Sequence, residues 1–181
     1  VGKQQLVEIA KALSKDVRLL ILLGDAPLIS TNTMQELISS DAPLTVLTSN
    51  VDDPQGYGRI IRDHGGSISA IVEERDATQQ QILIKEINTG VMAINSRSLS
   101  EWLPKLSRTN AQGEFLLTDI VAIANEQAIV VSPIVTEDKL EVSGVNTFMQ
   151  LADLERLLQQ RYAKDLQEAG VPVSYTHLTL P

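Results

Sequence analysis

The sequence contains no cysteine among its 181 residues. This absence excludes disulfide bonds, thiolate zinc sites and cysteine nucleophiles, and it is compatible with the cytoplasmic location that we expect. Long hydrophobic runs are also missing, since the longest, Val17–Leu23, contains Arg18 and is far shorter than the roughly 20 residues of a membrane helix. No basic leader precedes an apolar stretch, so we expect neither a membrane span nor an export signal.

Basic side chains are scarce relative to acidic ones. Lys and Arg number 15 against 23 Asp and Glu, which gives a formal net charge of −8. The basic residues form no cluster in the sequence, and an acidic protein repels a phosphate backbone, so we expect no nucleic-acid partner. A small phosphate-bearing molecule can still be held by backbone amides, a single cation or a metal ion.

Several catalytic motifs are absent as well. The sequence has no Ser-His-Asp arrangement, no metal-type histidine pair and no Walker loop. Acyl transfer through an activated nucleophile and P-loop chemistry are therefore excluded, and metal-assisted chemistry remains.

What is present indicates an α/β domain. A helical pattern around Val7–Leu13 precedes the apolar run Leu19–Leu23, which we expect to be a buried strand in a parallel sheet. Ser30 or Thr31 can cap the next helix, and Leu44–Thr48 follows as a second strand. Alternation of strand, helix and strand is typical of an α/β fold.

The second half of the sequence predicts an antiparallel insertion and then further α/β elements. The expected elements are a hairpin of Arg59–Arg62 and Ser67–Val72, strands at Ile82–Ile87, Val91–Ile94 and Ile129–Val135, and helices at 99–106, 120–124 and 148–162. The last of these helices is amphipathic.

Both ends of the sequence are unusual. The chain starts with Val1 inside a helix-like pattern, so we expect the beginning of its domain to be missing. The uncharged segment 172–181 includes Ser174–Pro181, which resembles a translated sequencing adapter. We therefore assign residues 1–171 to one partial domain and 172–181 to a non-native tail, with a native edge strand as the alternative.

Asp25 is the first candidate for chemistry. It follows Gly24 directly after the predicted strand, and ligands of open α/β sheets bind beyond the carboxyl ends of the strands. A carboxylate at this point suits Mg²⁺, which is usually held by one or two carboxylates together with substrate phosphates. The alternative is a turn aspartate that accepts amide hydrogen bonds before Ala26 and Pro27.

Four further candidates carry polar groups or flexible backbone in predicted loops. Gly58 lies in the Gly56-Tyr57-Gly58 turn, Glu73 ends a hairpin strand, and Asn88 lies between two predicted strands. Each is also explained by ordinary turn or surface chemistry. Asn146 can supply a carbonyl ligand to a metal, but it can equally cap the helix that begins near Phe148.

Six segments occur in an order that matches a known family. They are Leu20–Ile29, Asp52–Ile60, Ile71–Thr78, Glu86–Gly90, Asn110–Ile120 and Glu141–Asn146. Together they closely resemble the bacterial bifunctional N-acetylglucosamine-1-phosphate uridyltransferase/glucosamine-1-phosphate acetyltransferase, within its uridyltransferase domain. The resemblance implies a Rossmann-like (GT-A-like) nucleotidyltransferase with a mixed sheet, here truncated at its N-terminus.

The resemblance also implies an activity. Members of the family join UTP to N-acetylglucosamine 1-phosphate with the help of Mg²⁺, which gives UDP-N-acetylglucosamine for cell-wall precursors, and pyrophosphate. By the match of motifs, Asp25 and Asn146 are metal ligands, Gly58, Glu73 and Asn88 hold the N-acetylglucosamine, and Leu23 and Gly24 border the nucleotide sugar. No side-chain nucleophile is needed, because the phosphate of the substrate attacks directly.

The sequence also departs from the family pattern. Leu23 stands where the family usually has Tyr, and the glycine-rich loop with Arg and Lys that holds the triphosphate is not found before Val1. The acetyltransferase half, which contributes to the expected homotrimer of the parent protein, is absent. We therefore expect little turnover by this piece. Two alternatives are a non-catalytic module that binds sugar nucleotides and a related hexose-1-phosphate nucleotidyltransferase.

Overall fold

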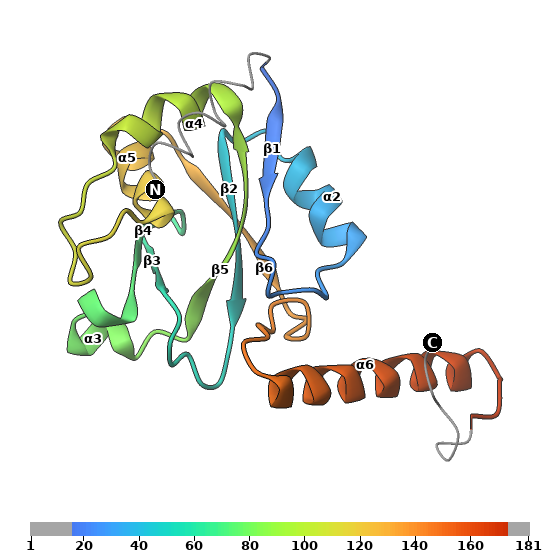
Figure 1. Ribbon diagram of the computed structural model, residues 1–181. Coiled ribbons are helices and arrows are strands. Elements are labelled where there is room, and N and C mark those ends of the chain that lie inside the picture. The colour runs from blue at the N-terminus through green and yellow to red at the C-terminus, as the bar shows by residue number, and fades with distance from the viewer. Residues whose placement is uncertain (1–15, 174–181) are drawn as a thin grey trace.

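The computed structural model describes residues 16–173, so the predicted helix around Val7–Leu13 and the tail from Ser174 lie outside the described residues. A mixed six-stranded sheet forms the centre of the molecule (Figure 1). Its strands are β1 (Arg18–Ile21), β2 (Leu44–Asn50), β3 (Arg59–Arg62), β4 (Ile68–Val72), β5 (Glu86–Asn95) and β6 (Val131–Thr136). The expected α/β class is confirmed.

Strand β5 organises the sheet. The strand order is β4-β3-β5-β2-β6, and β1 also pairs with β5. β5 runs antiparallel to β1, β2 and β3, while β2 and β6 are parallel to each other. β1, β2 and β6 therefore point the same way, and their carboxyl ends lie at one edge of the sheet.

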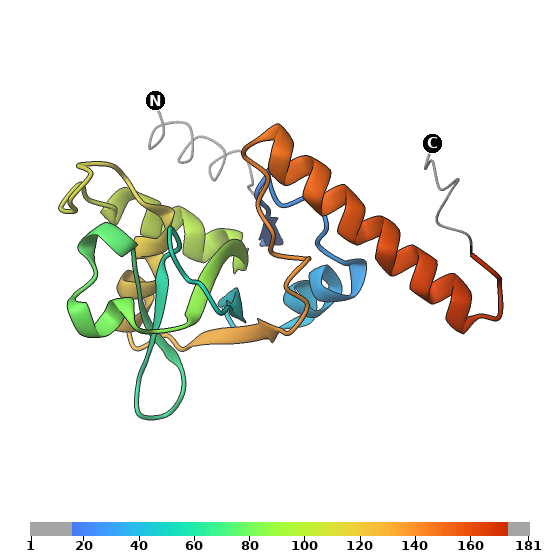
Figure 2. The same cartoon turned by 90° about the horizontal axis from the view of Figure 1, so that it is seen from below.

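Helices cover both faces of this sheet. Within residues 16–173 the helices are α2 (Thr31–Ser39), α3 (Gln79–Ile82), α4 (Ser96–Trp102), α5 (Ile120–Glu126) and α6 (Phe148–Glu168), with short 3-10 turns η1 (Glu74–Asp76), η2 (Leu103–Lys105) and η3 (Leu117–Asp119). Figures 1 and 2 show α4 and α5 on one side of the sheet and α2 on the other.

The core is divided in the same way, because successive side chains of a strand point to opposite faces. Met92 and Ile94 of β5 pack in the larger cluster, which includes the fully buried Trp102 of α4. Val91 and Ala93 pack in the smaller cluster with Leu37 of α2.

The first predicted strand is placed differently from the expectation. β1 is half-buried and pairs antiparallel with β5, so the prediction of a buried strand in a parallel sheet is wrong. Leu22 and Leu23 fall beyond its end and are each 44% exposed. The apolar run correctly predicted a strand. Its direction relative to its neighbour could not be predicted locally, because that neighbour is β5, some 70 residues later in the chain.

The region around Asn88 also differs. The predicted strand Ile82–Ile87 is wrong, because Thr78 caps the short helix α3 with a capping box and the strand begins only at Glu86. Asn88 lies inside the continuous strand β5, not between two strands. Gly90 lies in this strand with a φ of +78°, a conformation that side chains with a Cβ rarely adopt.

The other expected elements are confirmed, with shifts of a few residues at their ends. Ser30 Oγ accepts the N–H of Thr33 and caps α2, and β3 and β4 form the predicted hairpin. α6 begins with a capping box at Thr147 and extends away from the sheet (Figure 2). Among residues 16–173, no helix is both long enough and apolar enough to cross a membrane.

Candidate functional site

Asp25 lies in the turn after β1, in the segment Leu22–Ser30, which we call the Asp25 loop. Its side chain is exposed, and its carbonyl oxygen accepts a hydrogen bond of 2.7 Å from the N–H of Val145. Although β1 is not the predicted parallel strand, Asp25 still follows its carboxyl end. This is the edge where β2 and β6 also end, and where α/β sheets bind ligands.

Asn146 closes the segment Glu137–Asn146, which we call the Asn146 loop and which joins β6 to α6. The cap of α6 is Thr147, whose hydroxyl accepts the N–H of Gln150, so the alternative that Asn146 caps this helix is wrong. The exposed amide side chain of Asn146 is therefore not used as the helix cap.

Gly144 shows how close the two side chains come. A Cβ added to Gly144 would lie 3.9 Å from Asp25 Oδ2 and 3.9 Å from Asn146 Nδ2. The carboxylate and the amide thus flank the same glycine. We call Asp25, Gly144 and Asn146 the loop side of the site.

Glu141 supports the loop side, and sequence reasoning missed it. Its side chain is 5% exposed, and its Oε2 accepts hydrogen bonds from Thr33 Oγ1 (2.7 Å) and Thr136 Oγ1 (3.3 Å). The Asn146 loop is thereby tied both to α2 and to the end of β6. No local signal marks this glutamate as buried, because Thr33 lies 108 residues away in the sequence.

Gly58, Glu73 and Asn88 meet at the other side of the site, which we call the hairpin side. The N–H of Asn88 donates to the carbonyl oxygen of buried Gly58 at 2.8 Å. Glu73 Oε2 would lie 3.3 Å from a Cβ at Gly58, and Glu73 Oε1 accepts from Thr118 Oγ1 at 3.2 Å. The absence of a side chain at Gly58 is what leaves room for the Glu73 carboxylate.

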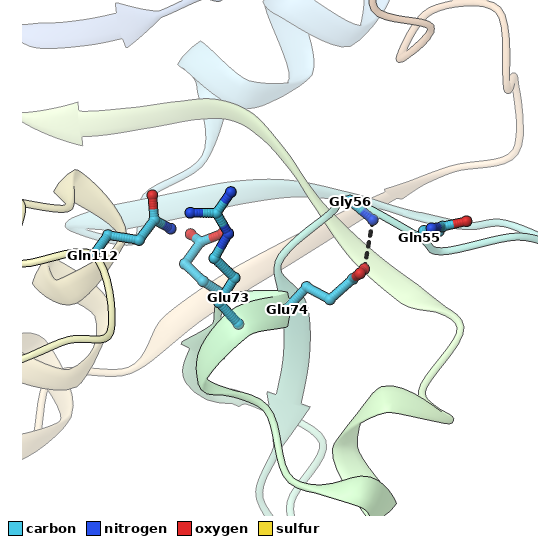
Figure 3. Close-up of a pocket in the computed structure, with 6 residues that line it drawn as sticks. Gln55, Gly56, Glu73, Glu74 and Gln112 are labelled. Atoms are coloured by element: carbon cyan, nitrogen blue, oxygen red, sulfur yellow. Dashed lines mark hydrogen bonds between the residues drawn. The ribbon is translucent and has the colours of Figure 1, made fainter.

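A cavity of about 350 Å³ opens on the hairpin side. It is lined by Gln55, Gly56, Glu73, Glu74, Arg75 and Gln112. Figure 3 shows Gln55 and Gly56 at one end of this pocket and Gln112 at the other, with Glu73 and Glu74 between them. Its lining is polar, which suits a hydroxyl-rich or charged ligand because these side chains donate and accept hydrogen bonds.

Carboxylates also gather beside this cavity. Burial, and then the nearby carboxylate of Asp76, raise the pKa of Asp119 above its usual range. Asp76 itself accepts the N–H of Ala111 at 2.8 Å and so anchors the loop that carries Gln112. Within residues 16–173, however, no group of three or more His, Asp or Glu side chains is arranged to hold a metal ion.

Leu23 lies between the two sides. A Cβ at Gly90 would be 2.9 Å from Leu23 Cγ and closer still to one of its methyl carbons, so Leu23 packs directly on the backbone of β5. The N–H of Gly90 in turn donates to Asn88 Oδ1 at 3.1 Å. Gly24 has open space around it. The structure thus brings the candidate residues into two groups, with Leu23 next to the strand that carries Asn88.

Comparison with known proteins identifies the relatives. No family model matches the chain. Proteins named bifunctional protein GlmU from Saccharophagus degradans, Acinetobacter baumannii and Francisella philomiragia are each 49% identical to it, over 83%, 88% and 88% of the chain. The chain is homologous to the GlmU proteins. It spans about a third of the length of these GlmU relatives, 34 to 36%.

The fold is shared with a solved nucleotidyltransferase structure. A Bacillus anthracis crystal structure described as a glucose-1-phosphate thymidylyltransferase in complex with sucrose matches with a TM-score of 0.61 and 20% identity, covering 87% of this chain and 60% of that one. The homology to GlmU and the Rossmann-like mixed α/β fold, both expected from the sequence, are thereby confirmed.

Proposed function

We propose that this chain belongs to a nucleotidyltransferase domain that transfers uridylyl from UTP to N-acetylglucosamine 1-phosphate, giving UDP-N-acetylglucosamine and pyrophosphate. The observation that carries the proposal is the pairing of two groups of residues around one edge of the sheet. Asp25 and Asn146 flank Gly144, while Gly58, Glu73 and Asn88 meet beside a polar cavity. Homology to the GlmU proteins supports the same activity.

On the loop side, Asp25 and Asn146 are the proposed ligands of Mg²⁺. Their side-chain oxygens are of the type that this hard cation prefers, and both residues are exposed beside a glycine that leaves space between them. With two protein ligands, the remaining positions are left to phosphate oxygens and water, as is usual for Mg²⁺. A bound Mg²⁺ neutralises phosphate charge during the displacement.

On the hairpin side, Glu73 and Asn88 are the proposed hydrogen-bond partners of the N-acetylglucosamine. A carboxylate accepts from sugar hydroxyls, and an amide both donates and accepts. Gly58 belongs to the same proposed sugar site, where its lack of a side chain leaves room for the Glu73 carboxylate, and Leu23 and Gly24 are proposed to border the nucleotide sugar. The chain supplies positioning and charge, which is sufficient when the acceptor phosphate is itself the nucleophile.

The direct test is calorimetry of the chain with UDP-N-acetylglucosamine, with and without Mg²⁺. We expect binding that strengthens with Mg²⁺, because two of the proposed contacts act through the metal. Equal binding without metal would favour a non-catalytic sugar-nucleotide module instead. Tighter binding of dTDP-glucose would favour a related hexose-1-phosphate nucleotidyltransferase, the activity named for the structurally similar Bacillus anthracis protein.

Turnover is measured by pyrophosphate release from UTP and N-acetylglucosamine 1-phosphate with Mg²⁺. We expect slow release by the 181-residue chain, which spans about a third of its relatives. We also propose, as part of the same assignment, that the full-length parent protein forms a homotrimer. Rapid turnover by the chain would contradict the expectation of low activity and strengthen the assignment of the reaction.

A further inference from the structure

The Gly56-Tyr57-Gly58 turn at the cavity is held by a buried cation. Arg59 follows this turn and is only 1% exposed. Its guanidinium donates to the carbonyl oxygen of Tyr57, to that of Ile82 at 3.4 Å and to Glu74 Oε2 at 3.2 Å. A buried guanidinium is costly unless its donors are used, so these partners fix where the turn can lie.

Glu74 completes the connection. Its Oε2 accepts both the Arg59 Nη2–H and, at 2.5 Å, the N–H of Gly56, the contact drawn in Figure 3. One carboxylate oxygen therefore links the start of the turn to the cation at its end. Charge-assisted hydrogen bonds of this kind are about twice as strong as neutral ones.

The same turn carries one of the proposed sugar contacts. The carbonyl oxygen of Gly58 accepts the N–H of Asn88, and the Cα of Gly58 faces the carboxylate of Glu73. Glu73 and Glu74 are adjacent in the sequence, yet only Glu74 is bonded to the turn. Any shift of the turn would move Gly58 against the carboxylate of Glu73 and so change how Glu73 lies at the cavity.

We propose that Glu74, acting through Gly56 and Arg59, is a positioning residue that sets the geometry of the sugar pocket. Glu74 lines the cavity, but its Oε2 is occupied by hydrogen bonds from Gly56 and Arg59, so the role assigned to it is to hold the turn. It fixes the turn so that Gly58, Glu73 and Asn88 keep the spacing that recognises the N-acetylglucosamine moiety. The inference rests on the proposed function for the identity of the ligand, whereas the anchoring of the turn is a property of the chain alone.

Amide hydrogen exchange measured by NMR tests the anchoring without any ligand. In Glu74→Ala we expect the Gly56 amide to exchange about tenfold faster or more, because its charged acceptor is gone. The Asn95 amide at the other end of β5, which donates to the carbonyl oxygen of Pro43, is expected to keep its rate and reports that the fold is intact. Unchanged exchange at Gly56 would overturn the proposal.

Glu74→Gln and Glu126→Ala are the matched variants. The glutamine oxygen can still accept from Gly56, so its exchange should lie between those of the unmodified chain and Glu74→Ala. Glu126 is exposed at the end of α5, and its removal should leave Gly56 unaffected. Faster exchange at Gly56 in Glu126→Ala would show a general loosening and would also overturn the proposal.

Calorimetry with N-acetylglucosamine 1-phosphate then tests the consequence. We expect Glu74→Ala to bind about tenfold more weakly and Glu74→Gln to recover part of the affinity, in parallel with exchange at Gly56. Faster exchange at Gly56 with unchanged affinity would overturn the positioning role. No binding by the unmodified chain would instead contradict the proposed function, and the exchange data would still decide whether Glu74 anchors the turn.

Discussion

On the hairpin side of the site, an ion pair with a buried cation holds the backbone, whereas on the loop side the buried carboxylate of Glu141 is held by the hydroxyl groups of Thr33 and Thr136, beside one backbone hydrogen bond. The side chain of Arg59 is 2% exposed in its ion pair with Glu74. Two ion pairs involve the Asn146 loop: Arg161–Asp138, with both side chains 36% exposed, and Lys139–Asp52, with side chains 55% and 90% exposed. Ion pairs at such exposure contribute little to stability, while a buried charge is expensive to leave without its partner.

This difference predicts two kinds of mutational effect. Changes on the hairpin side should lower the free energy of unfolding, because they leave a charged side chain without its partner or strain the backbone of β5. Changes at Asp25 or Asn146 should lower ligand affinity with little loss of stability, because those side chains are exposed and the backbone contact between their loops does not involve them. The predictions below test this contrast.

Arg59→Met should have the largest effect. We expect the free energy of unfolding to fall by about 3 kcal/mol, because the three hydrogen bonds that the buried Arg59 donates, to Glu74 and to two backbone carbonyl oxygens, are lost. Urea unfolding followed by circular dichroism gives the value. Arg97→Met is the control, since the Arg97 side chain is 82% exposed in its ion pair with Asp16. Equal stabilities of both variants would mean that the buried cation does not hold the hairpin side.

Gly90→Ala should have the second-largest effect on stability, at the position where Leu23 packs on the backbone of β5. We expect a loss of about 2 kcal/mol, because the φ of +78° disfavours a residue with a Cβ and the new methyl group meets Leu23. Gly24→Ala is the matched control, as no atom lies within 4 Å of a Cβ there. In a Leu23→Ala background, Gly90→Ala should cost less stability, because the contact with Leu23 is gone and only the cost of the positive φ remains.

Acid should reveal the ion pair between Arg62 and Glu86 on the hairpin side. Burial raises the pKa of Glu86, but hydrogen bonds from Arg62 and Thr48 outweigh it, so the pKa is lowered overall. A lowered folded-state pKa adds stability above the unfolded-state value, about 4.3, and that stability disappears as the pH falls through the folded-state pKa.

We therefore expect the stability of the unmodified chain to fall more steeply than that of Glu86→Gln as the pH drops below about 4.3. Urea unfolding at a series of pH values measures this difference. Parallel pH profiles for the two proteins would show that Glu86 has the same pKa in the folded and unfolded states.

Local sequence patterns predicted much of this fold. Turn residues between apolar runs predicted the hairpin β3–β4, Ser30 was one of two predicted caps of α2, and the amphipathic spacing of apolar residues predicted the long helix after Asn146; all of these signals depend on neighbouring residues. The patterns failed where partners are distant in the sequence. The direction of β1 is decided by β5, and the continuity of β5 through Asn88 depends on Gly90 adopting a positive φ.

The supports of the site were missed for the same reason. Glu141 and Glu74 occur in polar, turn-like segments that are typical of the surface. Glu141 becomes buried only because Thr33 and Thr136 reach it, and Glu74 becomes part of a charge pair only because Arg59 is enclosed by the fold. The candidate site residues were named from local motifs and from resemblance, whereas the residues that hold them in place are visible only in three dimensions.

Asp25→Asn should have the smallest effect on stability and therefore tests the contrast most directly. The asparagine keeps the size of the side chain, and the carbonyl oxygen of residue 25 still accepts the N–H of Val145. We expect the free energy of unfolding to change by less than about 0.5 kcal/mol, as for most exposed substitutions. Affinity for Mn²⁺, a paramagnetic substitute for Mg²⁺ measured by electron paramagnetic resonance, should fall by about tenfold or more because a charged oxygen ligand is lost.

Asp16→Asn is the matched control for that measurement, because Asp16 is also an exposed aspartate but lies before β1, at the opposite end of this strand from Asp25. Its Mn²⁺ affinity should equal that of the unmodified chain. A loss of stability above about 1 kcal/mol in Asp25→Asn would show that the loop side is built as tightly as the hairpin side, since exposed substitutions rarely cost so much. Unchanged Mn²⁺ affinity would remove Asp25 from the proposed metal site, and Asn146 alone could not hold the cation there.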